Sequence, residues 1–154
     1  MGSPLEAVLG DQLVIELEPQ PDEAAQIILV SGLVAYNESQ VGPDPVKQYS
    51  NHLCLLGRNA AGMVKAGLQA VLIDAWLVID LLWVAEDSRG QGAGTRLLEK
   101  TESIARERGA KWAILATFDY QAPDFYRRHG YVEYARMEDF PRGHTRFQMR
   151  KELA

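Results

Sequence analysis

The sequence predicts a mixed α/β fold in a single domain, and three observations lead to this prediction. The chain has 154 residues, 47% of them hydrophobic, so it is long enough to bury one sizeable core. Three strand-like segments follow one another between residues 52 and 85, as in an antiparallel meander. After them, helical and strand-like patterns alternate to the end of the chain, which is typical of a mixed sheet with helices packed against it.

The N-terminal segment predicts one strand and one helix. Residues 12–17 alternate polar and apolar side chains, as a half-buried strand does. Pro21-Asp22-Glu23 is typical of a helix start, because proline suits the first turn and carboxylates favour the positive end of the helix dipole. Apolar residues from Ala24 to Val34 predict a broad buried stripe on a helix that ends near Asn37. Gly42-Pro43-Asp44-Pro45 then predicts a loop.

The middle of the chain predicts a meander of three strands over residues 52–58, 62–73 and 75–85. The third segment is almost continuously apolar, which is typical of a central strand covered on both faces. A long helix begins near Gly92 and ends at Gly109, with apolar residues at helical spacing and Glu102 and Arg106 as an i, i+4 pair.

The C-terminal part predicts a buried strand, a short helix and a hairpin. The strand covers residues 111–117, and the helix opens at Pro123 and closes at Gly130. Residues 131–136 and 145–150 predict a final hairpin. The complete predicted order is β-α-(α)-β-β-β-α-β-α-β-β, a single domain over residues 1–154.

Composition and charge argue against several classes of protein. The single cysteine, Cys54, cannot form an internal disulfide and is expected to be a core thiol. The three histidines show no metal-ligand spacing, so no metal is expected. A net charge of −5 argues against nucleic-acid binding, and no apolar stretch approaches the roughly 20 residues of a membrane span. We therefore expect a cytoplasmic protein without nucleic-acid or membrane partners.

A glycine-rich turn, Arg89-Gly90-Gln91-Gly92-Ala93-Gly94-Thr95, joins the apolar strand to the long helix. Its glycines leave backbone N–H groups uncovered at a helix N-terminus, where the dipole favours an anion. A P-loop needs Lys followed by Ser or Thr after its last glycine, but Thr95-Arg96 follows here. A dinucleotide fingerprint needs glycine where Thr95 stands. The remaining interpretations are a different phosphate-binding turn or a turn without a ligand.

A second motif lies on the predicted short helix, where Ala122, Tyr126 and Gly130-Tyr131 follow at regular spacing. Together with the residues from Arg89 to Gly94, it resembles the acetyl-CoA-binding core of the GNAT N-acetyltransferase superfamily over about residues 76–136. The predicted order of elements is also similar to that fold. The resemblance implies an enzyme that transfers an acetyl group from acetyl-CoA to a primary amine by direct attack in a ternary complex.

The resemblance implies a role for each matched position. The backbone of Leu82, Trp83 and Val84 is expected to pair with the pantetheine arm, and the amides of residues 89–95 are expected to bind the pyrophosphate. Tyr126 is expected beside the sulfur as the general acid, because a phenol can donate a proton to the leaving thiolate; the alternative is a packed aromatic side chain. The family often has Asn where this chain has Asp119, so Gln121 is the alternative amide. Further expected cofactor contacts are Ala122 and Phe125.

The general base is predicted to be Asp80, the charged residue within the apolar strand. Strand periodicity places it on the same face as Val84, and burial there would raise its pKa and suit it to accept a proton. The structural alternative is a buried Asp paired with an arginine or the backbone. Other candidates for the base are water, Glu86, Asp87 and Asp119.

The acceptor is expected between the first helix, the central strands and the C-terminal hairpin, near Tyr36, Asn37, Glu38 and Trp76. A small amine is the first prediction, a peptide or protein amine the second, and a catalytically silent acyl-CoA-binding module the rival. Residues 1–76 carry three Lys/Arg against nine Asp/Glu, and Glu38 and Asp44 flank the predicted loop, which favours a cationic acceptor. The alternative is a solubilising acidic surface. The resemblance also makes a homodimer possible.

Overall fold

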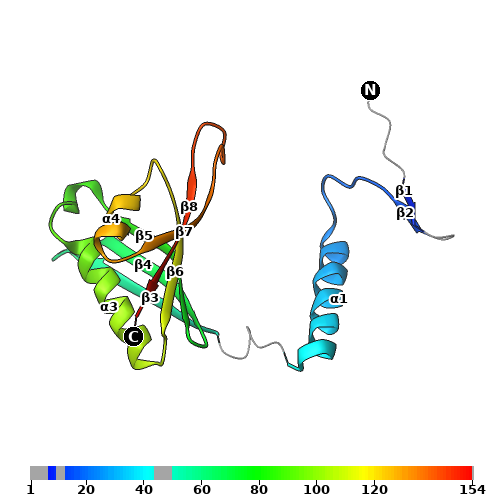
Figure 1. Ribbon diagram of the computed structural model, residues 1–154, viewed down its shortest axis with the longest axis horizontal. Helices are drawn as coiled ribbons and strands as arrows, with labels where there is room; N and C mark the ends of the chain where they lie inside the picture. The colour runs from blue at the N-terminus through cyan, green and yellow to red at the C-terminus, as the bar shows by residue number, and fades with distance from the viewer. Residues whose placement is uncertain (1–6, 10–12, 44–49, 154) are drawn as a thin grey trace. The chain divides into compact units, whose positions relative to one another are not determined.

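The computed structural model describes residues 7–9, 13–43 and 50–153, and it divides into two units, residues 1–45 and 46–154 (Figure 1). The two units are described separately. A single domain over all 154 residues stays a prediction.

The first unit contains two short strands and a helix. Strands β1 (Ala7–Leu9) and β2 (Leu13–Ile15) pair antiparallel, and helix α1 spans Glu23–Val41. The Asp22 side chain caps α1 by accepting a hydrogen bond of 2.7 Å from the Ala25 amide, as the predicted helix start implies. The predicted strand therefore corresponds to β2, although residue 12 lies outside the described residues, and α1 continues beyond Asn37 to Val41.

The predicted burial of α1 is not observed, because none of its residues is buried in the described structure. Two paired strands of three residues each offer too little surface to cover a helix of 19 residues. Among the described helices, none is both long and apolar enough to cross a membrane.

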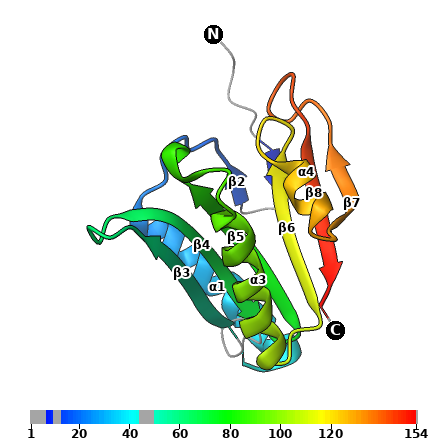
Figure 2. The same ribbon diagram turned by 90° about the vertical axis from the view of Figure 1, so that its left-hand side faces the viewer.

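The second unit is built on a six-stranded mixed sheet with the order β3-β4-β5-β6-β8-β7 (Figure 2). Its strands are β3 (Ser50–Arg58), β4 (Val64–Ile73), β5 (Trp76–Val84), β6 (Trp112–Phe118), β7 (Val132–Met137) and β8 (Arg146–Glu152). Strands β3 to β5 form the predicted antiparallel meander, β5 and β6 are parallel, and β7 and β8 form the predicted antiparallel pair. The mixed α/β prediction is thus confirmed.

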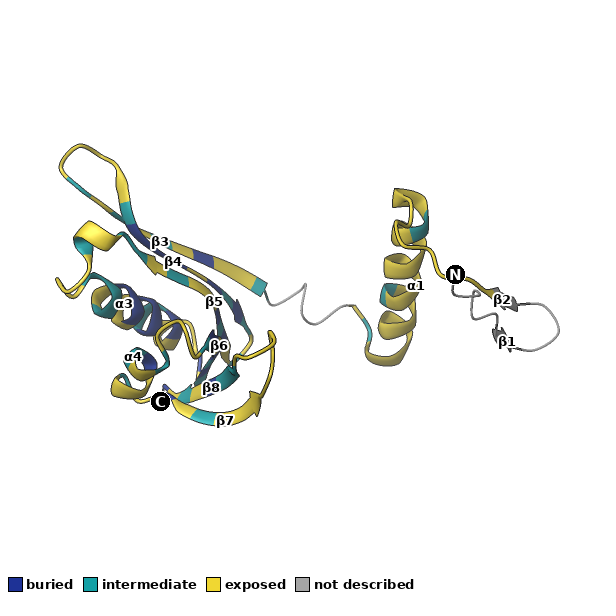
Figure 3. Cartoon of the chain, turned by 90° about the horizontal axis from the view of Figure 1, so that it is seen from above, coloured by how far each residue is buried: buried dark blue, intermediate teal, exposed yellow. Residues whose placement is uncertain are grey.

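Two helices and one short turn connect these strands. A 3-10 turn, η2 (Glu86–Ser88), and helix α3 (Ala93–Glu107) connect β5 to β6, and α4 (Pro123–Arg128) follows β6. Figure 3 shows α3 and α4 on the same side of the sheet, with buried residues between the two layers. The core takes side chains from the sheet, from both helices and from Tyr131.

Within the second unit taken by itself, β5 is covered on one face, and cover on both faces of this central strand stays a prediction. Leu77 and Ile79 of β5 lie in the core, whereas Trp76, Leu81 and Trp83 are exposed in the described structure. Cys54 is likewise exposed, so its prediction as a core thiol is wrong. Its neighbours explain the difference, because Leu53 is buried and Leu55 packs against the core, which turns the side chain between them to the other face.

Candidate active site

The candidate site begins where β5 and β6 stop pairing. Their parallel ladder runs from Trp76 and Trp112 to Ile79 and Leu115. Beyond that point, β4 still pairs with β5 as far as Val84, and β8 still pairs with β6. Figure 2 shows the two strands diverging from the end at which they pair. The facing edges of β5 and β6 therefore have backbone groups available to an extended ligand.

A β-bulge in β5 lies at the point of divergence. Ala70 of β4 pairs with Ile79, and Gln69 pairs with Leu81, so Asp80 between them has no partner in the ladder. The extra residue breaks the period of two, so the periodicity argument that placed Asp80 on the face of Val84 does not hold. Asp80 is also exposed rather than desolvated as expected. It nevertheless lines the same cavity as Val84.

A cavity of about 860 Å³ occupies the space between the diverging strands. Its size is within the range of small-molecule and cofactor sites. Its walls come from β5, the glycine-rich turn, the start of α3, the end of β6 and α4. The lining includes the predicted residues Asp80, Leu82, Trp83, Val84, Arg89, Gly90, Gly92, Ala93, Gly94, Thr95, Gln121, Ala122, Phe125 and Tyr126.

The glycine-rich turn brings backbone donors to the wall of the cavity. Gly90 and Gly92 have φ of +73° and +76°, a region that side-chain-bearing residues rarely adopt. Gly92 is the N-cap of α3 and supplies no side-chain cap, and the first turn of α3 carries no carboxylate. The first-turn amides of Ala93, Gly94 and Thr95 are therefore free of helical partners and beside the cavity. These donors fit an anionic group such as a pyrophosphate.

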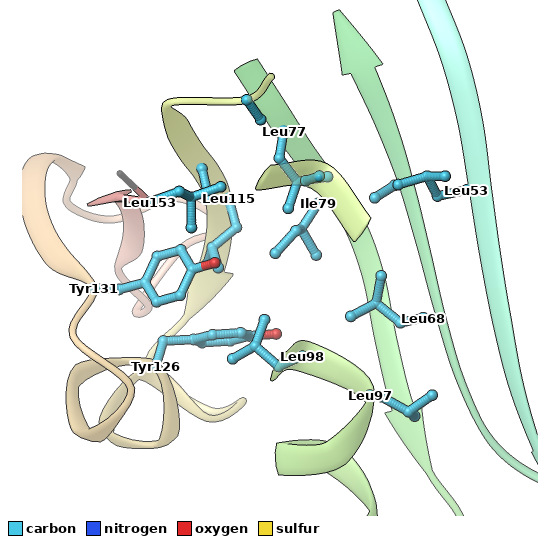
Figure 4. Close-up of a cluster of buried hydrophobic side chains, with 14 of the residues drawn as sticks. Leu53, Leu68, Leu77, Ile79, Leu97, Leu98, Leu115, Tyr126, Tyr131 and Leu153 are labelled. Carbon is cyan, nitrogen blue, oxygen red and sulfur yellow. The ribbon is translucent and has the colours of Figure 1, made fainter. Parts of the chain in front are cut away.

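Tyr126 lines the same cavity from α4. It is 8% exposed, and its ring meets those of Phe125 and Tyr131 edge to face at centroid distances of 5.1 and 5.8 Å. Figure 4 shows the rings of Tyr126 and Tyr131 next to each other. Burial raises the pKa of its hydroxyl, so the proton stays on the oxygen. Within the described part of the chain, no partner accepts a hydrogen bond from that hydroxyl. Tyr126 is thus packed as an aromatic side chain and also has an uncommitted proton beside the cavity.

Asp119 and Gln121, the two residues predicted for the side-chain contact with pantetheine, lie in different surroundings. Asp119 accepts a hydrogen bond of 3.1 Å from the Thr145 amide and lies 3.1 Å from Nδ1 of His144, so its carboxylate binds the loop between β7 and β8. It is not part of the cavity lining. Gln121 does line the cavity, and its Oε1 accepts from the Phe118 amide at 2.9 Å. The Gln121 side-chain amide therefore keeps its NH₂ group for a ligand.

Asp80 differs from the other candidate bases in its contacts. It has no hydrogen bond or ion pair with any described residue, so the alternative of a paired structural Asp is not observed. Asp87, by contrast, forms an ion pair of 2.5 Å with Lys65, and this hydrogen bond, followed by that from Ser88, lowers the pKa of Asp87. A lowered pKa makes a carboxylate a weaker base. Neither Asp87 nor Glu86 belongs to the cavity lining.

The expected acceptor residues belong to two units that are described separately. Trp76 lies at the other end of β5, where its ring stacks on that of Trp112 at 5.8 Å, and it is absent from the lining. Tyr36, Asn37 and Glu38 lie on α1 in the first unit, so their role at the acceptor stays a prediction. Asp44 lies outside the described residues.

The lining contains several residues that sequence reasoning did not select. The most polar of these are Ser88, Thr117, Tyr120 and Arg128. One signal could have found Thr117 and Tyr120. Because β5 and β6 are parallel, their carboxyl ends meet at one edge of the sheet, and these residues end or follow β6.

Comparison with known proteins agrees with this geometry. Residues 50–133 match the family model of the acetyltransferase (GNAT) domain. A blasticidin-S acetyltransferase of Streptomyces morookaense is 38% identical over 110 residues, which are 71% of this chain and 78% of that protein. The crystal structure of an acetyltransferase from Bacillus cereus is 34% identical, with a TM-score of 0.77, over 89% of this chain and 97% of that one.

A more distant structure, from Bacillus anthracis, is described as a putative streptothricin acetyltransferase in complex with acetyl coenzyme A. It shares the fold at a TM-score of 0.59 and 15% identity, over 70% of this chain and 67% of that one. The match to the family model covers more than half of the chain, from β3 to the start of β7. The diverging strands, the uncapped α3 and the chain's similarity to known acetyltransferases lead to the same conclusion: this chain is an N-acetyltransferase of the GNAT family.

Proposed function

We propose that this enzyme transfers the acetyl group of acetyl-CoA to a primary amine of a small, cationic molecule. The observation that carries the proposal is the hydroxyl of Tyr126, buried with its ring, uncommitted in the described structure and beside a cavity that the uncapped N-terminus of α3 also borders. A proton donor and an anion site in one cavity of this size suit a long anionic thioester substrate.

The residues of the cavity fit acetyl-CoA in three places. The edge of β5 from Leu82 to Val84, which β6 does not pair, suits the amides of the pantetheine arm, because those groups need partners of the kind a neighbouring strand provides. Of its groups, the Val84 carbonyl already accepts a hydrogen bond of 3.1 Å from Nε of Arg89. The first-turn amides of α3 suit the pyrophosphate. The free NH₂ group of Gln121 suits a pantetheine carbonyl. When bound, acetyl-CoA supplies the activated thioester, and the protein supplies position and proton transfer.

The chemistry assigned to the side chains balances in protons. The amine nitrogen attacks the thioester carbonyl, and the carbon–sulfur bond breaks. Asp80 takes the proton that the amine loses, directly or through a water molecule. Tyr126 donates its proton to the sulfur that leaves. Asp80 is suited to this role because it lines the cavity and has no competing partner among the described residues.

The acceptor class is supported by similarity and by charge. The blasticidin-S acetyltransferase relative is named for a small-molecule acceptor. In this chain, the first 76 residues carry the whole acidic excess, and a surface of one sign attracts ligands of the opposite sign. We therefore propose an acceptor with at least one positive charge in addition to the amine that reacts.

A panel of amines tests the proposal. CoA thiol release is followed with acetyl-CoA and matched cationic, neutral and anionic small amines, blasticidin S and a peptide N-terminus, at low and high salt. We expect a small cationic amine to be used best, with a KM that rises with salt. Mass spectrometry identifies the acetylated product. A preference for the peptide would contradict the acceptor class, and binding of acetyl-CoA without thiol release by any amine would favour a silent binding module.

A further inference from the structure

A histidine outside the assigned motifs contacts the anion site. His129 follows α4 as its C-cap residue and is partly buried against Phe125, with the ring centroids 4.4 Å apart. Its Nδ1 lies 2.7 Å from the carbonyl oxygen of Phe125, and its Nε2 lies 3.1 Å from Oγ1 of Thr95. The imidazole thus joins the backbone of α4 to the first turn of α3.

The two contacts fix where the protons are when the ring is neutral. A carbonyl oxygen can only accept a hydrogen bond, so Nδ1 carries the hydrogen. Nε2 then has a lone pair, and the hydroxyl of Thr95 must donate to it. Thr95 lines the cavity in the first turn of α3, where the proposed function places the pyrophosphate. The hydroxyl has one proton and cannot donate it to His129 and to a phosphate oxygen at once.

A protonated His129 removes this conflict. An imidazolium donates from both nitrogens, so Thr95 accepts from Nε2 and its own proton is released for the phosphate. Resting on the proposed function, we propose that His129 takes up a proton when a pyrophosphate binds at the N-terminus of α3, with Thr95 relaying the contact. His129 is then a positioning residue, because it acts on the ligand through the Thr95 hydroxyl.

The charges around the ring explain why the proton is expected to arrive with the ligand. Within the described residues, no charged side chain bonds to His129. The ionisable side chains nearest this point in the chain or in space are Arg89 in the glycine-rich turn, Asp124, Arg127 and Arg128 on α4, Lys151 on β8 and Asp80 on β5, together with Arg96, Glu99, Lys100 and Glu102 on the first three turns of α3. Two of the cations are paired, because Lys151 binds Glu102 and Arg127 binds Asp124. The cations without a carboxylate partner (Arg89, Arg96, Lys100 and Arg128) still outnumber the unpaired carboxylates Asp80 and Glu99 among the described residues. A bound pyrophosphate adds negative charge beside Thr95, and a nearby negative charge favours an imidazolium.

Calorimetry can measure the proton directly. The probe is dephospho-CoA, which carries the pyrophosphate but no phosphomonoester, so the ligand does not titrate near neutral pH. Its binding enthalpy is measured at about pH 7.5, where free imidazole is mostly neutral, in two buffers with different ionisation enthalpies. We expect an uptake of about half a proton to one proton per ligand bound, and none for pantetheine, which lacks the pyrophosphate.

Matched variants assign the proton. His129→Gln keeps a donor towards Thr95 but cannot be protonated, and Thr95→Val removes the relay and leaves His129 in place; both are expected to abolish the uptake. His52→Gln, on the exposed surface of β3, is expected to keep it. An equal uptake in His129→Gln, or binding by the wild type without any uptake, would overturn this inference alone. If folded wild-type protein does not bind dephospho-CoA, the proposed function fails as well.

Discussion

Tyr126 and Tyr131, five residues apart in the chain, are both buried but differ in the partners of their hydroxyl groups. Tyr126 and Tyr131 are 8% and 2% exposed, and their rings meet edge to face (Figure 4). The hydroxyl of Tyr131 donates to Oε1 of Glu102 at 2.9 Å, and Lys151 binds the other oxygen of that carboxylate at 2.6 Å. The hydroxyl of Tyr126 has no such partner among the described residues.

The difference shows how a fold keeps one polar group available. A buried hydroxyl without a partner costs free energy, so most are paired, as Tyr131 is. Tyr126 keeps its proton because burial disfavours the phenolate, while the cavity gives the hydroxyl space for a ligand. We therefore expect Tyr126 to matter for turnover and Tyr131 for stability.

The largest expected effect is a difference in turnover between Phe variants of the two tyrosines. Tyr126→Phe keeps the ring and removes the proton donor, so turnover should fall about 10- to 1,000-fold with little change in acetyl-CoA affinity. Tyr131→Phe is the matched control, and its turnover should stay close to that of the wild type under conditions in which it is folded. Steady-state kinetics with both variants measures the difference. Equal losses of turnover in the two variants would contradict a specific role of the Tyr126 hydroxyl in the reaction.

A second variant examines the partner in proton transfer. Asp80→Asn keeps the shape of the side chain and removes its basicity, so turnover should fall about 10- to 100-fold near neutral pH. The limb of the rate profile that rises with pH should move or vanish, and an external base should restore part of the activity. A pH profile identical to that of the wild type would assign the role to water or to another group.

The proposed pyrophosphate site at the N-terminus of α3 can be altered without changing either tyrosine. Gly92→Asp places a carboxylate at the N-cap of α3 and should weaken acetyl-CoA binding by about tenfold or more, because it competes with the pyrophosphate for the first-turn amides. Gly92→Asn is the control, with nearly the same shape, no charge and the same strain at positive φ. Calorimetric titration of the folded variants compares them, and equal affinities would remove the charge argument.

The hydrogen bond between Tyr131 and Glu102 predicts a difference in stability between variants of the two tyrosines. Tyr131→Phe leaves Glu102, which is 2% exposed, with one fewer donor, and should lower the free energy of unfolding by about 1–2 kcal/mol. Tyr126→Phe should change it by less, because no hydrogen bond is lost. Urea denaturation measures both, and the reverse order of the two variants would contradict the assignment.

The smallest expected effect is a gradual decrease in the free energy of unfolding at alkaline pH. Burial raises the pKa of both tyrosines above the value of about 10 in an unfolded chain, and the negative charge of Glu102 raises that of Tyr131 further. Their neutral forms stabilise the fold fully below about pH 10, and this contribution is lost as the pH rises through the folded-state values. Stability should therefore decline above pH 10, and less steeply in Tyr131→Phe. Denaturation at several alkaline pH values checks this.

Much of the fold was predictable because its signals are local. Glycine or proline stands at the ends of α3 and α4, as predicted. Tyr126 and most of the glycine-rich turn, which were predicted to contact the cofactor, line the cavity. The bulge at Asp80 was not predictable, because an extra residue in one strand leaves no distinct pattern in an apolar run.

Side-chain contacts between residues far apart in the chain could not be predicted from the sequence either. Glu102 was expected to pair with Arg106 on the same helix, and that ion pair exists at 3.8 Å. Its closer partners, Tyr131 and Lys151, come from other elements and bury the carboxylate. The same holds for Asp119, which binds the loop before β8, and for His129 with Thr95.

The central claim is direct transfer of the acetyl group in a cavity with Tyr126 as proton donor, and a single-turnover experiment tests it most directly. Protein in excess is mixed with acetyl-CoA, with and without the amine that the panel selects, and free CoA thiol is followed over time. The account predicts no thiol without the amine and, with it, one thiol and one acetylated amine for each acetyl-CoA consumed. Thiol release without amine, in proportion to the protein, would show an acetylated protein intermediate and contradict the account.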